Sequence, residues 1–112
     1  MITRKASSDW SALLESLADA RRRRLLRALR ETERIDHVCD RASEWAGPDA
    51  DDADVRLSMY HSHLPKLADD GLVVWDRERD AVARGPAFAE IVPVLDIVAG
   101  AENADRNAAG YC

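Results

Sequence analysis

The polar residues of this chain that could do chemistry gather in its second half. Two histidines, His61 and His63, flank Ser62 there, and Cys39 lies upstream. Side chains two positions apart on a helix point about 200° away from each other, so the histidines cannot share a metal ion as an i, i+4 pair can. We expect neither a metal site nor a cofactor.

Motifs of enzymatic catalysis are absent from the sequence. It contains no Gly-rich phosphate loop, no nucleophile elbow and no HExxH pattern. Ser62 and His63 are neighbours on one predicted helix and cannot form a nucleophile and its base on one face. The aspartates of "GPDADDAD" (47–54) have no identifiable partner base. We therefore expect that the protein is not an enzyme.

The histidines belong to a segment, Val55 to Asp70, whose pattern predicts a helix. Spacings of three and four place on its core side the residues Leu57, Tyr60, Leu64 and Leu67. The other side, free for a ligand, carries Ser58, Met59, Ser62 and Lys66. Pro65 removes the bond to the carbonyl of His61 and predicts a bend or a tightened turn, and Gly71 predicts the helix end.

After Gly71 the hydrophobic period changes from helical to alternating. Leu72 to Trp75 and Ala81 to Arg84 are predicted to be short strands, joined by the turn "DRERD". The pair forms a hairpin with Arg77 and Arg79 near its tip.

The first half of the chain is predicted to be helical. Asp9 caps an apolar pattern that includes Trp10 and Leu17, and the following "DARRRRLLRALRE" places Leu25, Leu26 and Leu29 on one face; these segments form one bent helix or two. Ile35 is expected in a strand of one or two residues. Asp36 is expected to cap a short helix with the apolar stripe Val38, Cys39, Ala42 and Trp45.

The remaining segments are loops and ends. Gly47 and Pro48 open a loop in which Asp54 can cap the next helix, Pro86 starts a last helix, and Pro93 predicts a kink in it. At 112 residues the chain forms one domain. We place it at 9–102, between a flexible N-terminus (1–8) and a flexible tail (103–112).

The order helix, helix, loop, helix, hairpin, helix is that of a winged helix-turn-helix, a mainly α fold with a β-hairpin wing. Its third helix fits a DNA major groove, and arginines of the hairpin reach the neighbouring backbone or minor groove.

The stretch "YHSHLPKLADDGLVVWDRERDAV" resembles the recognition helix and wing of the ArsR-like winged helix-turn-helix proteins. That family has Ser at the position of His61, and the matching residues are His63, Leu64, Leu67, Gly71, Leu72 and Val73. The metal-sensing cysteine pair of the family is missing from this helix. The chain is still more similar to a small winged-helix domain of uncertain function from salt-loving archaea, through "RRRRLLRALRE" and "HLPKLADDGLV".

The resemblance implies a transcriptional regulator that binds double-stranded DNA. The expected DNA-contacting residues are Arg56, Ser58, Met59, Ser62, His63, Lys66, Arg77 and Arg79. A homodimer is expected because one winged helix reads few base pairs and because the apolar segments Trp10 to Leu17 and Phe88 to Val98 need a surface to cover.

Composition indicates where the protein works. The net charge is -5, with 14 Asp, 7 Glu, 14 Arg and 2 Lys, a balance that suits the concentrated salt of a salt-loving archaeon or reflects a GC-rich genome. The sequence shows no signal peptide, its most apolar run contains Pro93 and Asp96, and its two cysteines suggest no disulfide framework. We expect a cytoplasmic protein without a membrane span.

Local charge leaves a second function open. Four aspartates precede the predicted DNA-contacting helix Val55 to Asp70: Asp49, Asp51, Asp52 and Asp54. They cap and solubilise the helix, or they contact a partner through salt. Likewise "RRRR" (21–24) is a solvated face with stems packed on the core, or a DNA patch. The alternative function is a winged-helix module that binds another protein without binding DNA.

Overall fold

The computed structural model describes residues 10–46 and 50–110, and side chains as far as Glu102. In chain order the elements are α2 (Trp10–Leu17), α3 (Ala20–Glu31), β1 (Arg34–Ile35), α4 (Ala42–Trp45), α5 (Asp52–Ser58), the π-helix η1 (Met59–His63), α6 (Leu64–Asp69), β2 (Val73–Asp76), β3 (Ala81–Arg84) and α7 (Phe88–Gly110). Residues 1–8, the predicted cap Asp9, and Gly47, Pro48 and Asp49 lie outside the described residues.

The N-terminal helical region consists of two helices rather than one bent helix. Asp19 separates them and caps α3, since its Oδ1 accepts hydrogen bonds from the backbone N–H groups of Arg21 at 2.7 Å and Arg22 at 3.4 Å. The predicted apolar face of α3 is confirmed, because Leu25, Leu26 and Leu29 are fully buried.

The short helix expected after Asp36 was placed too early. Asp36 does not cap it and instead pairs with Arg34 at 2.9 Å, and helix α4 begins at Ala42. Val38 donates its backbone N–H to the carbonyl of Asp80 at 2.9 Å, so this segment bonds to the hairpin instead of to its own helix. The predicted stripe Val38, Cys39, Ala42 and Trp45 is nevertheless buried.

The predicted third helix is a continuous helical run, Asp52–Asp69, made of α5, η1 and α6. It begins earlier than expected, because Asp51 rather than Asp54 caps it by accepting the N–H of Ala53 at 2.9 Å. The turn before Pro65 is widened and not tightened, since Leu64 donates its N–H to the carbonyl of Met59, five residues back. A π-turn accommodates a proline that cannot donate to the usual partner.

The wide turn changes which side of the run faces the core. Each π bond spans one residue more than an α bond, and the buried side advances in steps of four through Val55, Met59, His63 and Leu67. The predicted core side was therefore wrong at Leu57, which is 59% exposed, and at Tyr60, which is 40% exposed.

Gly71 ends the run as predicted. It adopts a left-handed φ of 76°, and Leu72 donates its N–H to the carbonyl of Leu67 while Gly71 donates to that of Ala68. This is a Schellman cap, for which glycine is the least strained residue. Gly85 comes close to the same turn: a Cβ there would lie 2.4 Å from the carbonyl oxygen of Gly71.

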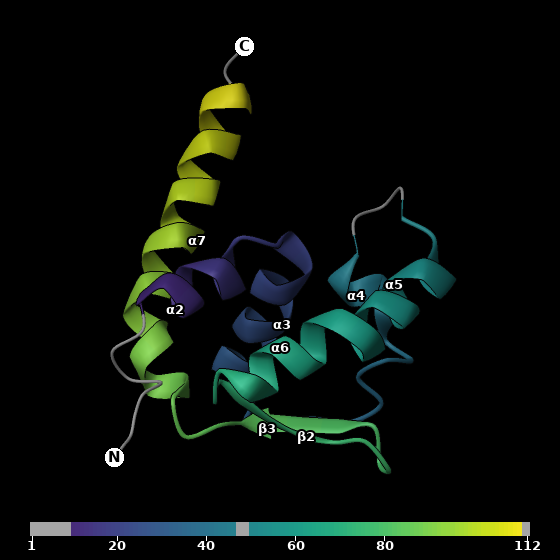
Figure 1. The fold of residues 1–112 in the computed structure, drawn as a ribbon. Helices are drawn as coiled ribbons and strands as arrows, with labels where there is room; N and C mark the ends of the chain where they lie inside the picture. Colours follow the sequence, from purple (N-terminus) through teal and green to yellow (C-terminus); the bar gives the residue numbers. More distant parts are fainter. Residues whose placement is uncertain (1–9, 47–49, 111–112) are drawn as a thin grey trace.

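The predicted hairpin is confirmed, with its first strand shifted by one residue. β2 and β3 pair antiparallel with Trp75 opposite Val82, and the turn Arg77–Asp80 joins them. β1 adds to the other edge of β3, as the short strand predicted at Ile35, so that the sheet has the order β1-β3-β2. The described chain is thus mainly helical with a small three-stranded antiparallel sheet, which lies below α3 and α6 in Figure 1.

Helix α7 passes Pro93 without ending and runs to Gly110, through most of the segment expected as a flexible tail. Its first turns bury Phe88, Ile91 and Leu95. Ion pairs bind it to α3: Arg30 to Asp96 at 2.9 Å, and Arg23 and Arg27 to Glu102. Figure 1 shows the C-terminal half of α7 standing clear of the other elements. Within the described residues, no helix combines the length and hydropathy needed to cross a membrane.

Candidate functional site

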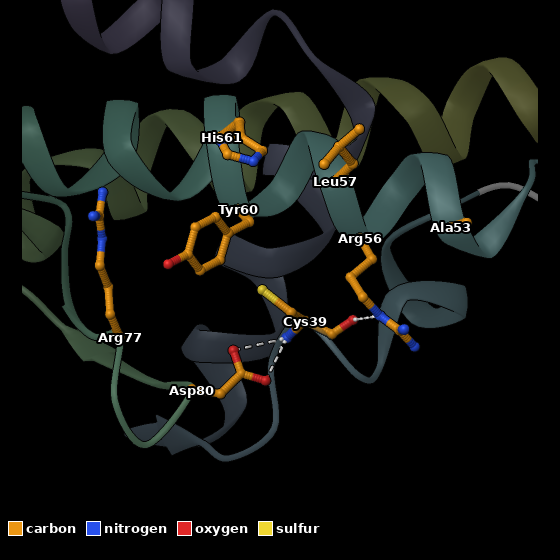
Figure 2. Close-up of a pocket in the computed structure, with 8 residues that line it drawn as sticks. All are labelled: Cys39, Ala53, Arg56, Leu57, Tyr60, His61, Arg77 and Asp80. Atoms are coloured by element: carbon orange, nitrogen blue, oxygen red, sulfur yellow. Dashed lines mark hydrogen bonds between the residues drawn. The ribbon is translucent and has the colours of Figure 1, made fainter.

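A cavity of about 400 Å³ lies between the helical run and the hairpin turn (Figure 2). The described residues that line it are Cys39, Ala53, Arg56, Leu57, Tyr60, His61, Arg77 and Asp80. We call this the helix–hairpin surface. Residues from α5, η1 and the hairpin turn meet here because the cap at Gly71 folds the hairpin back along the helical run.

Arg77 joins the hairpin to the helix through aromatic rings. Its guanidinium carbon lies 4.7 Å from the ring centre of Trp75 and 5.6 Å from that of Tyr60. The two rings contact each other edge to face, with centres 5.2 Å apart. Cation–π attraction therefore holds an exposed guanidinium over the cavity.

Arg56 supplies the second cation of the surface. Its Nε donates to the backbone carbonyl of Cys39 at 3.4 Å, and its Nη2 lies 3.9 Å from Asp40. The side chain is 55% exposed, so its charge remains accessible to a ligand. In Figure 2, Arg56 and Arg77 lie on opposite sides of Tyr60.

Cys39 and Asp80 line a part of the cavity wall whose polar groups bond mainly to each other. The carboxylate of Asp80 accepts the backbone N–H of Cys39 at 3.1 and 3.2 Å. Burial, with the nearby Asp80 carboxylate, raises the pKa of the Cys39 thiol to about 12. The thiol is neutral at physiological pH and acts as an apolar wall rather than as a nucleophile.

The predicted DNA-contacting residues divide into three groups. Exposed ones are Arg56, Ser62, Arg77 and Arg79. Those engaged within the protein are Ser58 and Lys66. Met59 is fully buried and His63 is 6% exposed, so neither side chain reaches the surface, because the π-turn rotates both toward the core.

Ser58 and Lys66 have partners that compete with any ligand. The Ser58 hydroxyl accepts from Arg21 Nη1 at 2.8 Å and donates to the carbonyl of Val55 at 3.0 Å. Lys66 Nζ lies 2.8 Å from Glu15 and 3.2 Å from Asp70. Burial lowers the pKa of Lys66, but the two carboxylates outweigh this effect and raise the pKa. The ammonium group therefore stays charged, and its charge is already balanced within the protein.

The run Arg21–Arg24 is built into the fold. Arg22 donates from Nε to the carbonyl of Ser16 at 2.9 Å and from Nη2 to that of Glu15 at 2.8 Å; Arg23 donates to that of Leu17 at 2.7 Å. These are final carbonyls of α2, which have no partner in their own helix. Arg24 donates to the carbonyl of Trp45 at 2.9 Å. These bonds support the interpretation that the arginine side chains pack on the protein. Their main role is to hydrogen-bond to backbone carbonyls, not to form a solvated face.

His63 is the buried partner of this arginine run. Arg22 Nη1 lies 3.0 Å from His63 Nδ1, and an arginine can only donate, so Nδ1 is the acceptor and Nε2 carries the proton of the neutral ring. Nε2 lies 3.8 Å from Asp19 Oδ1. Burial lowers the pKa of His63 below 6.5, and Arg22 adds to this against the attraction of Asp19.

This depressed pKa predicts a loss of stability in mild acid. The unfolded chain binds the His63 proton more tightly, so the free energy of unfolding is at its full value above about pH 6.5 and falls as the pH drops toward the folded pKa. His63→Gln keeps an acceptor for Arg22 and should flatten the dependence between pH 7.5 and 5.5 in urea unfolding. A slope unaltered by His63→Gln would contradict the assignment.

The pattern of the sequence did not identify Leu57, Tyr60 and His61 as surface residues of the site. The sequence pattern assigned Leu57 and Tyr60 to the core. A prediction that Pro65 widens the preceding turn would have placed them on the surface. No group of three or more His, Cys, Asp or Glu side chains suited to a metal ion occurs in the described part of the chain.

Comparison with known proteins gives a family but no activity. A family model described as a domain of unknown function (DUF7344) matches residues 14–83, from α2 to β3. No curated protein matches the chain, and no solved structure does.

Proposed function

The chain belongs to the DUF7344 family, and because that description assigns no activity, we propose a function from the helix–hairpin surface. The protein is a DNA-binding transcriptional regulator with a winged helix-turn-helix fold related to the ArsR-like proteins. The helical run Asp52–Asp69 enters the major groove and the hairpin acts as the wing on the DNA backbone.

One observation carries this proposal. Arg56 from the helix and Arg77 from the hairpin border one surface, and both guanidinium groups are accessible. A major groove is about 12 Å wide and is flanked by phosphates on both sides, so cations on either side of a protruding helix match its charge.

The proposed contacts are a smaller set than the sequence suggested. They are Arg56, Ser62, Arg77 and Arg79, with Tyr60 and His61 added. Arg79 extends from the hairpin turn, 75% exposed and 3.9 Å from Asp76. Met59 and His63 are withdrawn because they are buried, and Ser58 and Lys66 because they bind other side chains.

A homodimer in the cytoplasm of a salt-adapted cell completes the proposal. Large apolar side chains outside the helix–hairpin surface are exposed on α2 and α7: Trp10 at 58%, Leu14 at 57% and Ile97 at 71%. Covering them with a second copy removes apolar area from water and places two reading helices in successive grooves. Strong salt screens the remaining acidic surface.

The alternative is a protein-binding module that does not bind DNA. The acidic start of α5, with Asp51, Asp52 and Asp54 exposed, favours a basic partner over phosphate. The pairing of Lys66 with Glu15 and Asp70 also removes one of the expected DNA contacts.

Selection from random DNA duplexes in molar potassium chloride distinguishes the DNA-binding regulator from the protein-binding module. We expect enrichment of discrete sequences by the full chain. Arg56→Gln and Arg77→Gln should each weaken binding to the selected duplex by about tenfold or more, since each removes one charged contact.

Arg30→Gln is the matched control, because Arg30 is an exposed arginine of α3 that faces Asp96 of α7. It should bind as the parent does, provided that all variants show the parent's circular dichroism. Failure to enrich any duplex would decide against DNA binding and for the protein-binding module.

A further inference from the structure

Two large apolar side chains are exposed on the helical side of the helix–hairpin surface. Leu57 is 59% exposed and Tyr60 40%, and both line one cavity together with Ala53, which is also exposed. The thiol of Cys39 adds a neutral wall. Apolar side chains of this size at the centre of a binding surface gain free energy only when a partner covers them.

Two arginines lie beside these apolar side chains and line the same cavity. Arg56 and Arg77 lie on the two sides of Tyr60 (Figure 2). Among the described residues that line the cavity, Asp80 is the one carboxylate, and it accepts the N–H of Cys39. The nearby Asp40 lies 3.9 Å from Arg56. Tyr60 thus has an arginine on each side, whereas Ala53 lies beyond Arg56 and between the exposed Asp52 and Asp54 in the chain.

We infer that the patch of Ala53, Leu57 and Tyr60 binds thymine methyl groups in the major groove, so that the protein selects duplexes with thymine under this patch. The inference rests on the proposed function. The thymine C5 methyl is the apolar group that base pairs present in the major groove. A methyl group covered by Leu57 and Tyr60 leaves both guanidinium groups free for phosphates or guanine edges on either side.

An apolar partner protein fits this arrangement less well. A leucine or phenylalanine of a partner could enter the cavity, but it would leave two arginines to be paired by further acidic groups. Duplex DNA supplies the apolar group and the flanking negative charge together. The two arginines on either side of Tyr60 therefore favour a nucleic acid.

Replacing thymine by uracil tests the inference, because uracil lacks only the methyl group. The duplex selected by the full chain in molar potassium chloride is resynthesised with deoxyuridine at one thymine at a time. We expect binding to weaken by about threefold to fourfold at each thymine whose methyl is covered, and to stay unchanged at the others.

Leu57→Ala should reduce this thymine preference at one or more of those positions. Val74→Ala is the matched control, since Val74 is 57% exposed but lies on β2 and does not line the cavity; it should keep the full preference. Equal affinity for the thymine and uracil duplexes at every position would overturn the inference and leave DNA binding intact. Failure to select any duplex would overturn both.

Discussion

Met59→Ala is expected to lower the free energy of unfolding by about 2–5 kcal/mol, the usual cost of removing a large side chain from a packed core. Met59 is fully buried within η1, where it packs with the core cluster that includes Leu25 and Leu64. Urea unfolding in molar potassium chloride, followed by circular dichroism, measures the change.

Leu57→Ala is the internal control for this result. It lies two residues away in the same helical run, and at 59% exposure its loss should change stability by no more than about 0.5 kcal/mol. If the two costs were reversed, the helical run would face the core as an ordinary α-helix does, and the π-turn would be wrong. The assignment of Leu57 and Tyr60 to the binding surface would fail with it.

Arg22→Met is expected to destabilise the protein by roughly 2–4 kcal/mol, although the methionine keeps much of the apolar stem. The change removes the donors to the carbonyls of Glu15 and Ser16 and leaves His63 Nδ1 without its partner. The cost is high because the carbonyl of Ser16 and the ring nitrogen of His63 lose this donor in partly buried places, whereas the exposed carbonyl of Glu15 keeps the backbone N–H of Ala18 at 3.1 Å.

Arg21→Met separates this effect from the loss of a positive charge. Arg21 is also half-buried on α3, but the change there removes the hydrogen bond to the hydroxyl of Ser58 instead of a set of three. It should cost about 1 kcal/mol. Arg22→Lys should recover little, because an ammonium group cannot span two carbonyls and an imidazole as a planar guanidinium does. Equal costs at the two arginines would contradict the capping role of Arg22.

The fold could be predicted from the sequence wherever a local rule acts alone. The glycine at position 71 requires no tertiary information to end a helix, because only glycine takes a left-handed φ without strain. The leucines of α3 repeat at helical spacing, and the change to alternation after Gly71 predicts the hairpin within one residue. In each of these elements, propensity, pattern and packing agree.

Prediction failed where two local rules compete. Pro65 breaks the hydrogen bonding of a helix whose apolar pattern continues, and the pattern does not say whether the chain tightens, bends or widens there. Packing of the helical run against the core selects the wide turn, and that choice buries Met59 and His63 and exposes Leu57 and Tyr60. The candidate site changed accordingly, from polar residues of one helix face to a partly apolar surface.

The sequence by itself determined the mainly helical class, the hairpin, and the arginines at its tip, because these depend on neighbours within a few positions. Only the tertiary structure decided what Arg21–Arg24 do and which side of the run Asp52–Asp69 is exposed. The carbonyls that Arg22 and Arg24 satisfy, and the rings that hold Arg77, come from elements that meet only in the folded chain. The sequence does not distinguish an arginine that is hydrogen-bonded within the fold from one that is accessible to a ligand. Only the neighbouring groups in the folded protein show which role each arginine has.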